Sequence, residues 1–236
     1  MRALTLAIAV AQPAITPHAL HENAIAHAAA IAAASARVVV FPELSLSGYE
    51  LDASPVALDD AALSVVVEAC AEWNSVALVG APIEESGRLS IATVRIDSGG
   101  ASVVYRKSWL HGDELLRFTP GTGPTTTQVD GWVIGLAICK DTGQSRHTAA
   151  MAALHVDVYA AGVVDVPADV VECRARAFVI SRSLGAPVAM ASFAGPTGGG
   201  FAETAGHSAI HAADGRLLVE ADEMPGRVAR AVLACG

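Results

Sequence analysis

Three side chains that could carry out acyl chemistry each close an apolar run of the chain. Glu43, Lys107 and Cys139 directly follow such runs. A buried strand that presents a thiol at its terminal turn can hold a nucleophile rigidly at a sheet edge. A carboxylate and an ammonium group at two other strand ends could both serve that thiol. These three residues are therefore the candidate catalytic centre.

The chemistry of the three groups is complementary. Cysteine attacks carbonyl or nitrile carbons as a thiolate, and a free thiol with a pKa of about 8.5 is mostly protonated at neutral pH. Lys107 could supply a positive charge that stabilises both the thiolate and a developing oxyanion. Glu43 could accept the thiol proton, pass it to a leaving nitrogen and later activate water. This division of roles predicts covalent catalysis through Cys139.

The rest of the chain must supply the elements that bring these residues together. Strand and helix patterns alternate, with no linker, repeat or low-complexity tail. We therefore expect one domain over residues 1–236, of the α/β class, with two sheets backed by helices. Helices are predicted at residues 18–36, 56–74, 145–154 and 169–184. Strands are predicted at residues 37–41, 75–82, 88–96, 101–105, 125–129, 132–138, 156–160, 188–192, 208–211, 216–220 and 228–233.

Composition limits the classes of partner. The 236 residues are 53% hydrophobic and 17% charged, so the chain can bury a large core. The net charge of -9, and the absence of any run of four basic residues, argue against nucleic acid and anionic membranes as partners. No apolar run approaches the roughly 18 residues of a membrane span. The expected partner is a small molecule.

The beginning of the chain can be interpreted in two ways. Residues 4–11 follow Arg2 and resemble a short signal peptide, or they form a first core strand that stops at Gln12 and Pro13. We favour the strand because a single arginine is a weak basic region. The cysteines form no CxxC pair, and a chain with a large core does not need disulfides, so we predict free thiols and a cytoplasmic protein. The four are Cys70, Cys139, Cys173 and Cys235.

Three segments resemble the signatures of the nitrilase superfamily of carbon–nitrogen hydrolases, in its amidase-like branch. They read VVFPELS at residues 39–45, YRKSWL at residues 105–110 and GLAICKD at residues 135–141, in the order and spacing of the family. Glu114, with the FTPG of residues 118–121, is similar to the family segment after the lysine. The start of the chain and its last hairpin also fit, so the resemblance covers nearly the whole sequence.

The resemblance implies a fold, a reaction and roles for individual residues. The fold is an α-β-β-α four-layer sandwich of two mixed sheets flanked by helices, usually in a homodimer or larger oligomer. The reaction is hydrolysis of a non-peptide C–N bond through a thioester or thioimidate, without a cofactor. Glu43 is then the general base, Lys107 stabilises the oxyanion and Cys139 is the nucleophile. Glu114 orients the lysine or positions substrate, and the backbone N–H of Lys140 completes an oxyanion hole.

The segment after the cysteine departs from the family pattern. Lys140 stands where an aromatic residue is frequent, while Gly143 and Arg146 occupy the usual places of an arginine and a glutamate. In several branches that arginine binds a substrate carboxylate. Its loss weakens the case for N-carbamoyl amino acids or ω-amides, although Lys140 or Arg146 could replace it. The short chain also argues against nitrilases that form spirals, and a small aliphatic amide is the expected substrate.

Two other functions remain open from the sequence. An acyl or amide transferase would use the same three residues and differ only in what attacks the thioester. A catalytically silent relative would act as a binding or assembly protein, and the altered residues after Cys139 could mark such a loss.

The remaining polar and aromatic residues carry weaker signals. The glycine-rich residues 195–200 lack the following helix and the spacing of a phosphate-binding loop. Trp109, Trp132 and Phe193 could line a pocket or pack in the core. Arg174 and Arg176 could form ion pairs or dimer contacts.

The histidines do not predict a metal site. His207 and His211 are four residues apart but lie in a strand region without neighbouring carboxylates. His18, His21 and His27 are expected on the surface of a helix. Because no HExxH or Cys/His grouping is present, we predict no metal.

Overall fold

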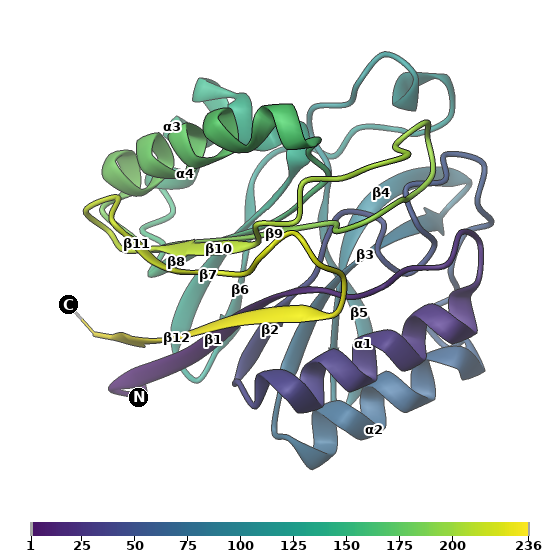
Figure 1. Cartoon of the computed structure of the whole chain (residues 1–236), viewed down its shortest axis with the longest axis horizontal. Helices are drawn as coiled ribbons and strands as arrows, with labels where there is room; N and C mark the ends of the chain where they lie inside the picture. Colours follow the sequence, from purple (N-terminus) through teal and green to yellow (C-terminus); the bar gives the residue numbers. More distant parts are fainter. Residues whose placement is uncertain (1, 236) are drawn as a thin grey trace.

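The computed structural model describes residues 2–235, which form two six-stranded sheets (Figure 1). The central strands of each sheet are parallel and the outer strands pair antiparallel. The first sheet has the order β12 (Arg227–Ala234), β1 (Thr5–Gln12), β2 (Val38–Val40), β3 (Val76–Glu85), β4 (Arg88–Asp97) and β5 (Gly100–Arg106). The second has the order β11 (Leu217–Glu220), β10 (Ala209–His211), β9 (Val188–Ser192), β8 (Val158–Val163), β7 (Trp132–Ile138) and β6 (Thr125–Val129).

Two pairs of helices cover the outer faces of the sheets. The first sheet carries α1 (Leu20–Ala34) and α2 (Ser64–Glu72), and the second carries α3 (Ser145–Ala152) and α4 (Val170–Leu184) (Figure 1). The layers therefore run helix, sheet, sheet, helix, which confirms the predicted four-layer α-β-β-α sandwich. Within residues 2–235, no helix is both long and apolar enough to span a membrane.

The strand alternation of β1 divides its side chains between two apolar layers. Leu6, Ile8 and Val10 pack in the core between the sheets, whereas Ala9 and Ala11 pack beneath the helices. Because both faces are buried, β1 reads as a continuous apolar run, as expected for a central strand. Alanine on the helix side allows close approach, and each large side chain on the other face contributes about 1.5–3 kcal/mol on burial. The predicted first strand is thus confirmed.

The first two helices are shorter than predicted. His18 has a φ of +60°, which is outside the helical region, and α1 begins at Leu20. It ends at Ala34, because the next residue, Ser35, has a left-handed φ of +42° that stops the helix. The predicted helix at residues 56–74 begins only with the 3₁₀ turn Ala61–Leu63, where the Asp60 side chain accepts a hydrogen bond from the Ala62 N–H at 2.8 Å.

His27 was predicted to lie on the surface of a helix, but it is fully buried. Its Nδ1 lies 2.6 Å from the Asn23 carbonyl oxygen and its Nε2 lies 2.8 Å from the Ser45 hydroxyl. Burial lowers the pKa of His27 to about 4, so the ring is neutral. The prediction failed because helix periodicity could not show that the loop after Glu43 packs back onto α1. His27 thereby fixes that loop.

Candidate active site

Glu43 lies in the turn after β2, wedged between the two sheets. Two glycines make room for this turn, Gly80 on β3 and Gly162 on β8. A Cβ at Gly80 would lie 2.4 Å from the Pro42 carbonyl oxygen, and one at Gly162 would lie 2.5 Å from the Phe41 carbonyl oxygen. Both distances are far below van der Waals contact, so only glycine allows the turn to approach so closely. The Glu43 side chain is fully buried there.

Lys107 follows β5 and points into the same interior space. Its backbone N–H donates to the Ile91 carbonyl and its carbonyl accepts from the Gly121 N–H, both at 2.8 Å. The side chain is fully buried. Its Nζ donates to Glu43 Oε1 at 2.6 Å and to Glu114 Oε1 at 2.7 Å. One buried ammonium group is therefore shared by two buried carboxylates.

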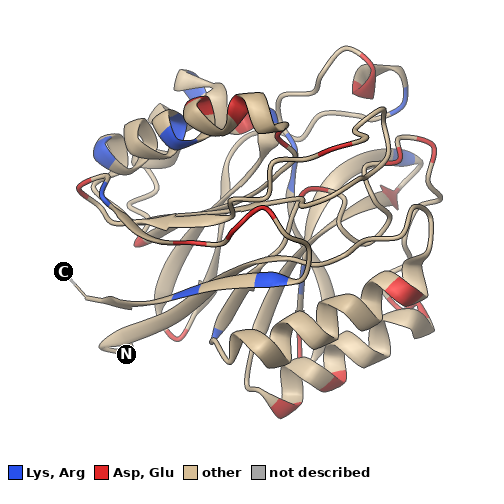
Figure 2. Cartoon of the chain, viewed as in Figure 1, with Lys and Arg blue, Asp and Glu red and all other residues tan. Residues whose placement is uncertain are grey.

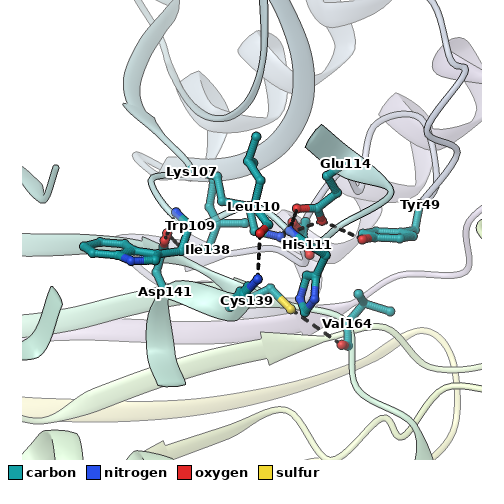
Figure 3. A network of polar contacts seen from close by, with 12 residues as sticks. Tyr49, Lys107, Trp109, Leu110, His111, Glu114, Ile138, Cys139, Asp141 and Val164 are labelled. Atoms are coloured by element: carbon teal, nitrogen blue, oxygen red, sulfur yellow. Dashed lines mark hydrogen bonds and ion pairs between the residues drawn. The ribbon is translucent and has the colours of Figure 1, made fainter. Parts of the chain in front are cut away.

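Glu114 begins a short 3₁₀ turn, Glu114–Leu116, inside the loop that follows Lys107. Its Oε1 also accepts a hydrogen bond from the Tyr49 hydroxyl at 2.6 Å, and its Oε2 accepts from the His111 backbone N–H at 2.8 Å (Figure 3). With three donors around one carboxylate, Glu114 has a single orientation. That orientation fixes the lysine ammonium group.

Cys139 follows the last residue of β7 and opens the 3₁₀ segment Cys139–Gly143. Its φ is +43°, a left-handed value that costs a residue other than glycine about 1–3 kcal/mol. The Sγ lies 3.8 Å from the Val164 carbonyl oxygen (Figure 3). The Thr142 hydroxyl donates to the Cys139 carbonyl at 2.6 Å. Such strain at a buried thiol is typical of a functional position.

Asp141 joins the cysteine turn to the segment around the lysine. Its Oδ1 accepts from the backbone N–H groups of Ser108 at 3.2 Å and Trp109 at 2.9 Å. Its Oδ2 accepts from the Ile138 N–H at 3.0 Å and from the Tyr105 hydroxyl at 2.7 Å. The carboxylate is fully buried and has four donors, so it determines the relative position of the two strand ends.

The electrostatics of the cluster assign a charge state to each group. Burial raises the pKa of Glu43 to about 7, with the Lys107 charge opposing this shift. Burial disfavours the charged form of Lys107, but the negative charges of Glu43 and Glu114 outweigh it and raise the lysine pKa. Burial would also raise the pKa of Glu114, yet the charge and hydrogen bond of Lys107, together with the other donors, lower it.

The cysteine thiol keeps its proton at rest. Burial, followed by the neighbouring Glu43 charge, raises the pKa of Cys139 well above its usual value, and Lys107 only partly opposes this. At neutral pH the cluster therefore contains a charged lysine, an ionised Glu114, a neutral thiol and a Glu43 near its midpoint. Transfer of the proton from Cys139 to Glu43 is therefore unfavourable in the resting site.

A cavity of about 570 Å³ opens at Cys139. This volume is within the usual range for small-molecule sites. Its wall comes from segments far apart in the sequence, including Tyr49, His111, Gln144, Val164 and Phe201.

The two candidate replacements for the missing arginine lie in different places. Lys140 lines the cavity, and its Nζ donates to the Leu110 carbonyl at 2.7 Å. Arg146 is exposed and, within residues 2–235, is not among the residues that line this cavity. Arg176, in contrast, lines the cavity and donates to Asp165 at 2.6 Å. The interpretation of Arg176 as an ion-pair residue is confirmed.

The aromatic residues proposed for a pocket belong mainly to the core. Trp132 and Phe193 are buried, and the Trp132 Nε1–H donates to the Ala3 carbonyl at 3.0 Å. Trp109 packs edge-on against His147, with ring centroids 5.6 Å apart. Among the described residues, none of these three aromatics lines the cavity at Cys139.

The predicted absence of a metal site remains a prediction. His18, Glu50 and Asp52 place one potential ligand atom each within 4.8 Å of one another on the surface. Exposed groups of this kind are common without an ion. The four cysteines are free thiols, as expected.

Sequence reasoning gave no role to Tyr49, His111 and Asp165, which surround the centre, and suggested for Arg176 only an ion pair or a dimer contact. Tyr49 lies four residues after the first signature segment, which ends at residue 45, and its closeness to that segment was a usable signal. His111 is three residues before Glu114, which is the spacing that lets its N–H cap that carboxylate. Asp165 and Arg176 carried no pattern, because β8 and α4 bring them to the cavity only in the folded chain.

Comparisons with known proteins agree with the fold. A mutant of an amidase from Nesterenkonia AN1, of the nitrilase superfamily, superposes with a TM-score of 0.85, 23% identity and coverage of 97% of this chain and 90% of that one. A branch 10 member of the nitrilase superfamily from Saccharomyces cerevisiae has a TM-score of 0.86 and 17% identity, with coverage of 99% and 91%. At these identities the likeness establishes the architecture.

The sequence comparisons extend from fold to family. An (R)-stereoselective amidase from Pseudomonas sp is 29% identical over 136 residues, which are 56% of this chain and 50% of that protein. The match thus spans about half the length of the curated relative. The carbon-nitrogen hydrolase family model matches residues 7–233, nearly the whole chain. The protein therefore belongs to the carbon–nitrogen hydrolase family.

Proposed function

We propose that the protein hydrolyses a small linear amide through a thioester on Cys139, with Glu43 and Lys107 completing the catalytic triad. The observation that carries this proposal is the buried contact of Lys107 with both Glu43 and Glu114 beside the strained thiol. Removing two carboxylates and an ammonium group from water costs free energy that their mutual attraction need not repay, so such a cluster is weak evidence for a purely stabilising role. Their convergence on a nucleophile at a cavity is the arrangement that covalent amide hydrolysis requires.

In the first half-reaction, Glu43 accepts the Cys139 proton while Sγ attacks the amide carbon. The new C–S bond moves the carbonyl π electrons onto oxygen, and the charge of Lys107 and the backbone N–H of Lys140 stabilise that oxyanion. Glu43 then gives its proton to the amide nitrogen. The C–N bond breaks, ammonia leaves, and the acyl group remains as a thioester.

In the second half-reaction, Glu43 accepts a proton from water as the water oxygen attacks the thioester carbon. The tetrahedral species collapses, the C–S bond breaks, and the carboxylic acid leaves. The proton on Glu43 returns to Sγ. A pKa of about 7 for Glu43 suits a group that must act as base and acid in turn at neutral pH.

Glu114 acts through the lysine in this scheme. It accepts from Lys107 and is itself held by Tyr49 and the His111 N–H. Lys107 therefore cannot move fully towards Glu43, which leaves its charge available to the substrate oxygen. This role makes Glu114 a positioning residue.

The substrate size is proposed from the cavity and from what is printed of a related amidase. One structure of the Nesterenkonia amidase contains butyramide, and another carries the acetamide moiety of fluoroacetamide at the active-site cysteine. A cavity of about 570 Å³ readily accommodates such molecules. We therefore propose a short aliphatic amide.

The decisive experiment is ammonia release from butyramide, isovaleramide, an N-carbamoyl amino acid and a nitrile, beside the Cys139→Ala variant. Release from the amides that disappears in the variant supports the proposal. Release that persists in the variant, or no release from any compound, contradicts it. Hydroxylamine in the same assay distinguishes a transferase, because a transferase would form hydroxamate faster than acid.

We further propose that the protein forms a homodimer through the face made by α3 and α4. Val179 is exposed on α4 and lines a groove of about 430 Å³ that runs between the two helices. A second copy of the chain would bury this apolar side chain. The groove shares Gly143, Glu172 and Arg176 with the cavity at Cys139, so dimer formation would also support the site.

The oligomeric state tests this second proposal. Light scattering should give the mass of a dimer for the wild type and of a monomer for Val179→Asp. The matched control is Ile25→Asp, an exposed apolar residue on α1, which should remain dimeric. A monomeric wild type would contradict the proposal.

A further inference from the structure

The charged side chains that line the cavity are unequally divided between the two signs. The acidic ones outnumber the basic ones by two, and they come from three separate segments: Asp113 after Lys107, Asp165 after β8, and Asp169 and Glu172 at the start of α4, against Lys140 and Arg176.

Arg176 is already paired inside the protein. Its Nη2 donates to Asp165 Oδ1 at 2.6 Å, and the two side chains are 18% and 6% exposed. Asp165 Oδ2 and Arg176 Nε are both buried and have no hydrogen-bond partner within residues 2–235. The guanidinium charge is therefore compensated by an adjacent carboxylate that still has a free acceptor oxygen. A substrate carboxylate near Arg176 would have to displace Asp165 or approach it against repulsion.

Lys140 is the other cation of the cavity wall. It is half-buried, and one of its ammonium protons is donated to the Leu110 carbonyl. Three further carboxylates share the wall, those of Asp113, Asp169 and Glu172, which are partly or fully exposed at the mouth. One lysine cannot reverse the sign of a surface that carries three carboxylates, so the potential at the entrance is negative.

We propose, on the basis of the amidase function above, that the site takes amides whose acyl part is neutral or carries an ammonium group, and excludes amides that carry a carboxylate. Interactions between charges on a cavity wall and a bound ion are stronger than in bulk water, because low-dielectric walls focus the field. The acidic mouth therefore selects against anions while it attracts cations. Gly143 stands at the place of the family arginine, so Arg176, already paired with Asp165, is the one guanidinium among the described residues that line the cavity.

Two pairs of substrates with matched shape isolate the effect of charge. Butyramide and β-alaninamide differ by a methyl group replaced with ammonium, and isovaleramide and malonamate differ by an isopropyl group replaced with carboxylate. We expect kcat/KM for β-alaninamide to equal or exceed that for butyramide. We expect malonamate to be at least about tenfold poorer than isovaleramide. Equal rates for malonamate and isovaleramide, or a clear preference for malonamate, would overturn the proposal.

A charge-removal variant tests whether the cavity mouth is responsible. The triple variant Asp113→Asn, Asp169→Asn and Glu172→Gln should lower the kcat/KM ratio of β-alaninamide to butyramide by roughly threefold. It should lower the ratio of isovaleramide to malonamate by a similar factor. Both effects are modest because water and salt screen exposed charges. Raising sodium chloride from about 0.02 M to about 0.5 M should have a similar effect on the wild type. The matched control combines Asp59→Asn, Glu68→Gln and Glu72→Gln, which lie before or on α2 in the opposite helical layer (Figure 2). Equal effects of both triple variants would overturn the assignment to the mouth.

The Asp165→Asn variant is an independent test, because it should make the site more favourable to an anionic amide. It releases Arg176 from its ion pair and adds one positive charge to the wall. Malonamate hydrolysis should then improve by at least about tenfold relative to isovaleramide. An unchanged ratio in a folded variant would contradict the role of this ion pair in charge selection.

The assay separates this inference from the proposed function. If Cys139-dependent hydrolysis of butyramide and isovaleramide is observed but the charged amides react at the same rates as the neutral ones, the inference is rejected and the proposed amidase function stands. The absence of Cys139-dependent hydrolysis of all four amides rejects both.

Discussion

The carboxylate of Asp141 and the backbone N–H of Trp109 form a hydrogen bond of 2.9 Å that joins the cysteine turn to the segment after the lysine. The two residues are 32 positions apart, and Trp109 lies in the loop after β5 of the first sheet whereas Asp141 lies in the turn after β7 of the second sheet. Because the same carboxylate also accepts from the Ile138 N–H, it sets the separation between the Cys139 turn and the segment that follows Lys107. Its effect on the reaction is therefore indirect but measurable.

Asp141→Asn should lower kcat by about 10²-fold with little change in KM, because a displacement of about 1 Å between catalytic groups costs this much. The amide of asparagine can accept on one side only, so the bonds from Ile138 and Tyr105 are lost. The matched control is Asp157→Asn, since Asp157 accepts from the Val133 N–H at the opposite end of β7. A normal kcat in Asp141→Asn, or an equal loss in the control, would refute the positioning role.

Cys139→Ala should abolish ammonia release while the variant keeps its far-ultraviolet circular dichroism, because only a small side chain is removed. Cys70→Ala is the matched control. Its thiol is buried beneath α2, donates to the Ile96 carbonyl at 3.4 Å and has a pKa that burial raises to about 11. The control should retain activity, and the iodoacetamide label on the peptide that contains residue 139 should be lost only in Cys139→Ala. Residual turnover in Cys139→Ala would refute the nucleophile assignment.

The rate of hydrolysis should rise with pH through a midpoint near 7. Burial raises the pKa of Glu43 to about 7, and the carboxylate is the active base only above that value. Below it, kcat/KM should fall about tenfold for each pH unit. Glu43→Gln should be inactive at every pH yet remain alkylatable at Cys139. A midpoint near 4.5, the ordinary range for glutamate, would contradict the proposed environment.

Lys107→Met should lose about 10²–10³-fold in rate and also about 3–5 kcal/mol of unfolding free energy at pH 8, because two buried carboxylates are left without their cation. Without the lysine, the folded-state pKa values of Glu43 and Glu114 lie above the unfolded values. Stability is then greatest at low pH and is lost as pH rises. Urea unfolding should therefore show a smaller deficit at pH 5 than at pH 8.

Lys140→Met provides the control for that stability measurement. Lys140 is half-buried and bonds to the neutral Leu110 carbonyl, so its removal should cost less than about 1 kcal/mol, as for other surface sites. The cost should not vary between pH 5 and pH 8. A pH-independent deficit in Lys107→Met would contradict the shared buried ion pair.

Gly162→Ala should reduce activity strongly, because the added Cβ would meet the Phe41 carbonyl oxygen at 2.5 Å and the Glu43 nitrogen at 2.9 Å. The Glu43 turn must move, and its carboxylate moves with it. Gly112→Ala is the control, since nothing lies within 4 Å of its added Cβ. Comparable activity of both variants would show that the turn tolerates displacement.

Much of the architecture could be predicted from the sequence. Apolar runs bounded by turn residues marked β7 and the hairpin of β4 and β5, because alternation and burial are local properties of a strand. The same reasoning placed Glu43, Lys107 and Cys139 at strand ends, and the resemblance in their flanking segments indicated the family. The single-domain assignment of residues 1–236 stays a prediction.

What the sequence by itself determined was therefore the place of the candidate catalytic side chains at strand ends and the family to which the chain belongs. Only the tertiary structure decided which groups meet. Gly80 and Gly162 had no sequence signal, since their role is to let one turn pass between two sheets. The Asp165–Arg176 pair, the orientation of Glu114 and the acidic cavity mouth likewise depend on contacts between distant segments. Local patterns determine strands and helices, whereas a buried charge network is fixed by long-range packing.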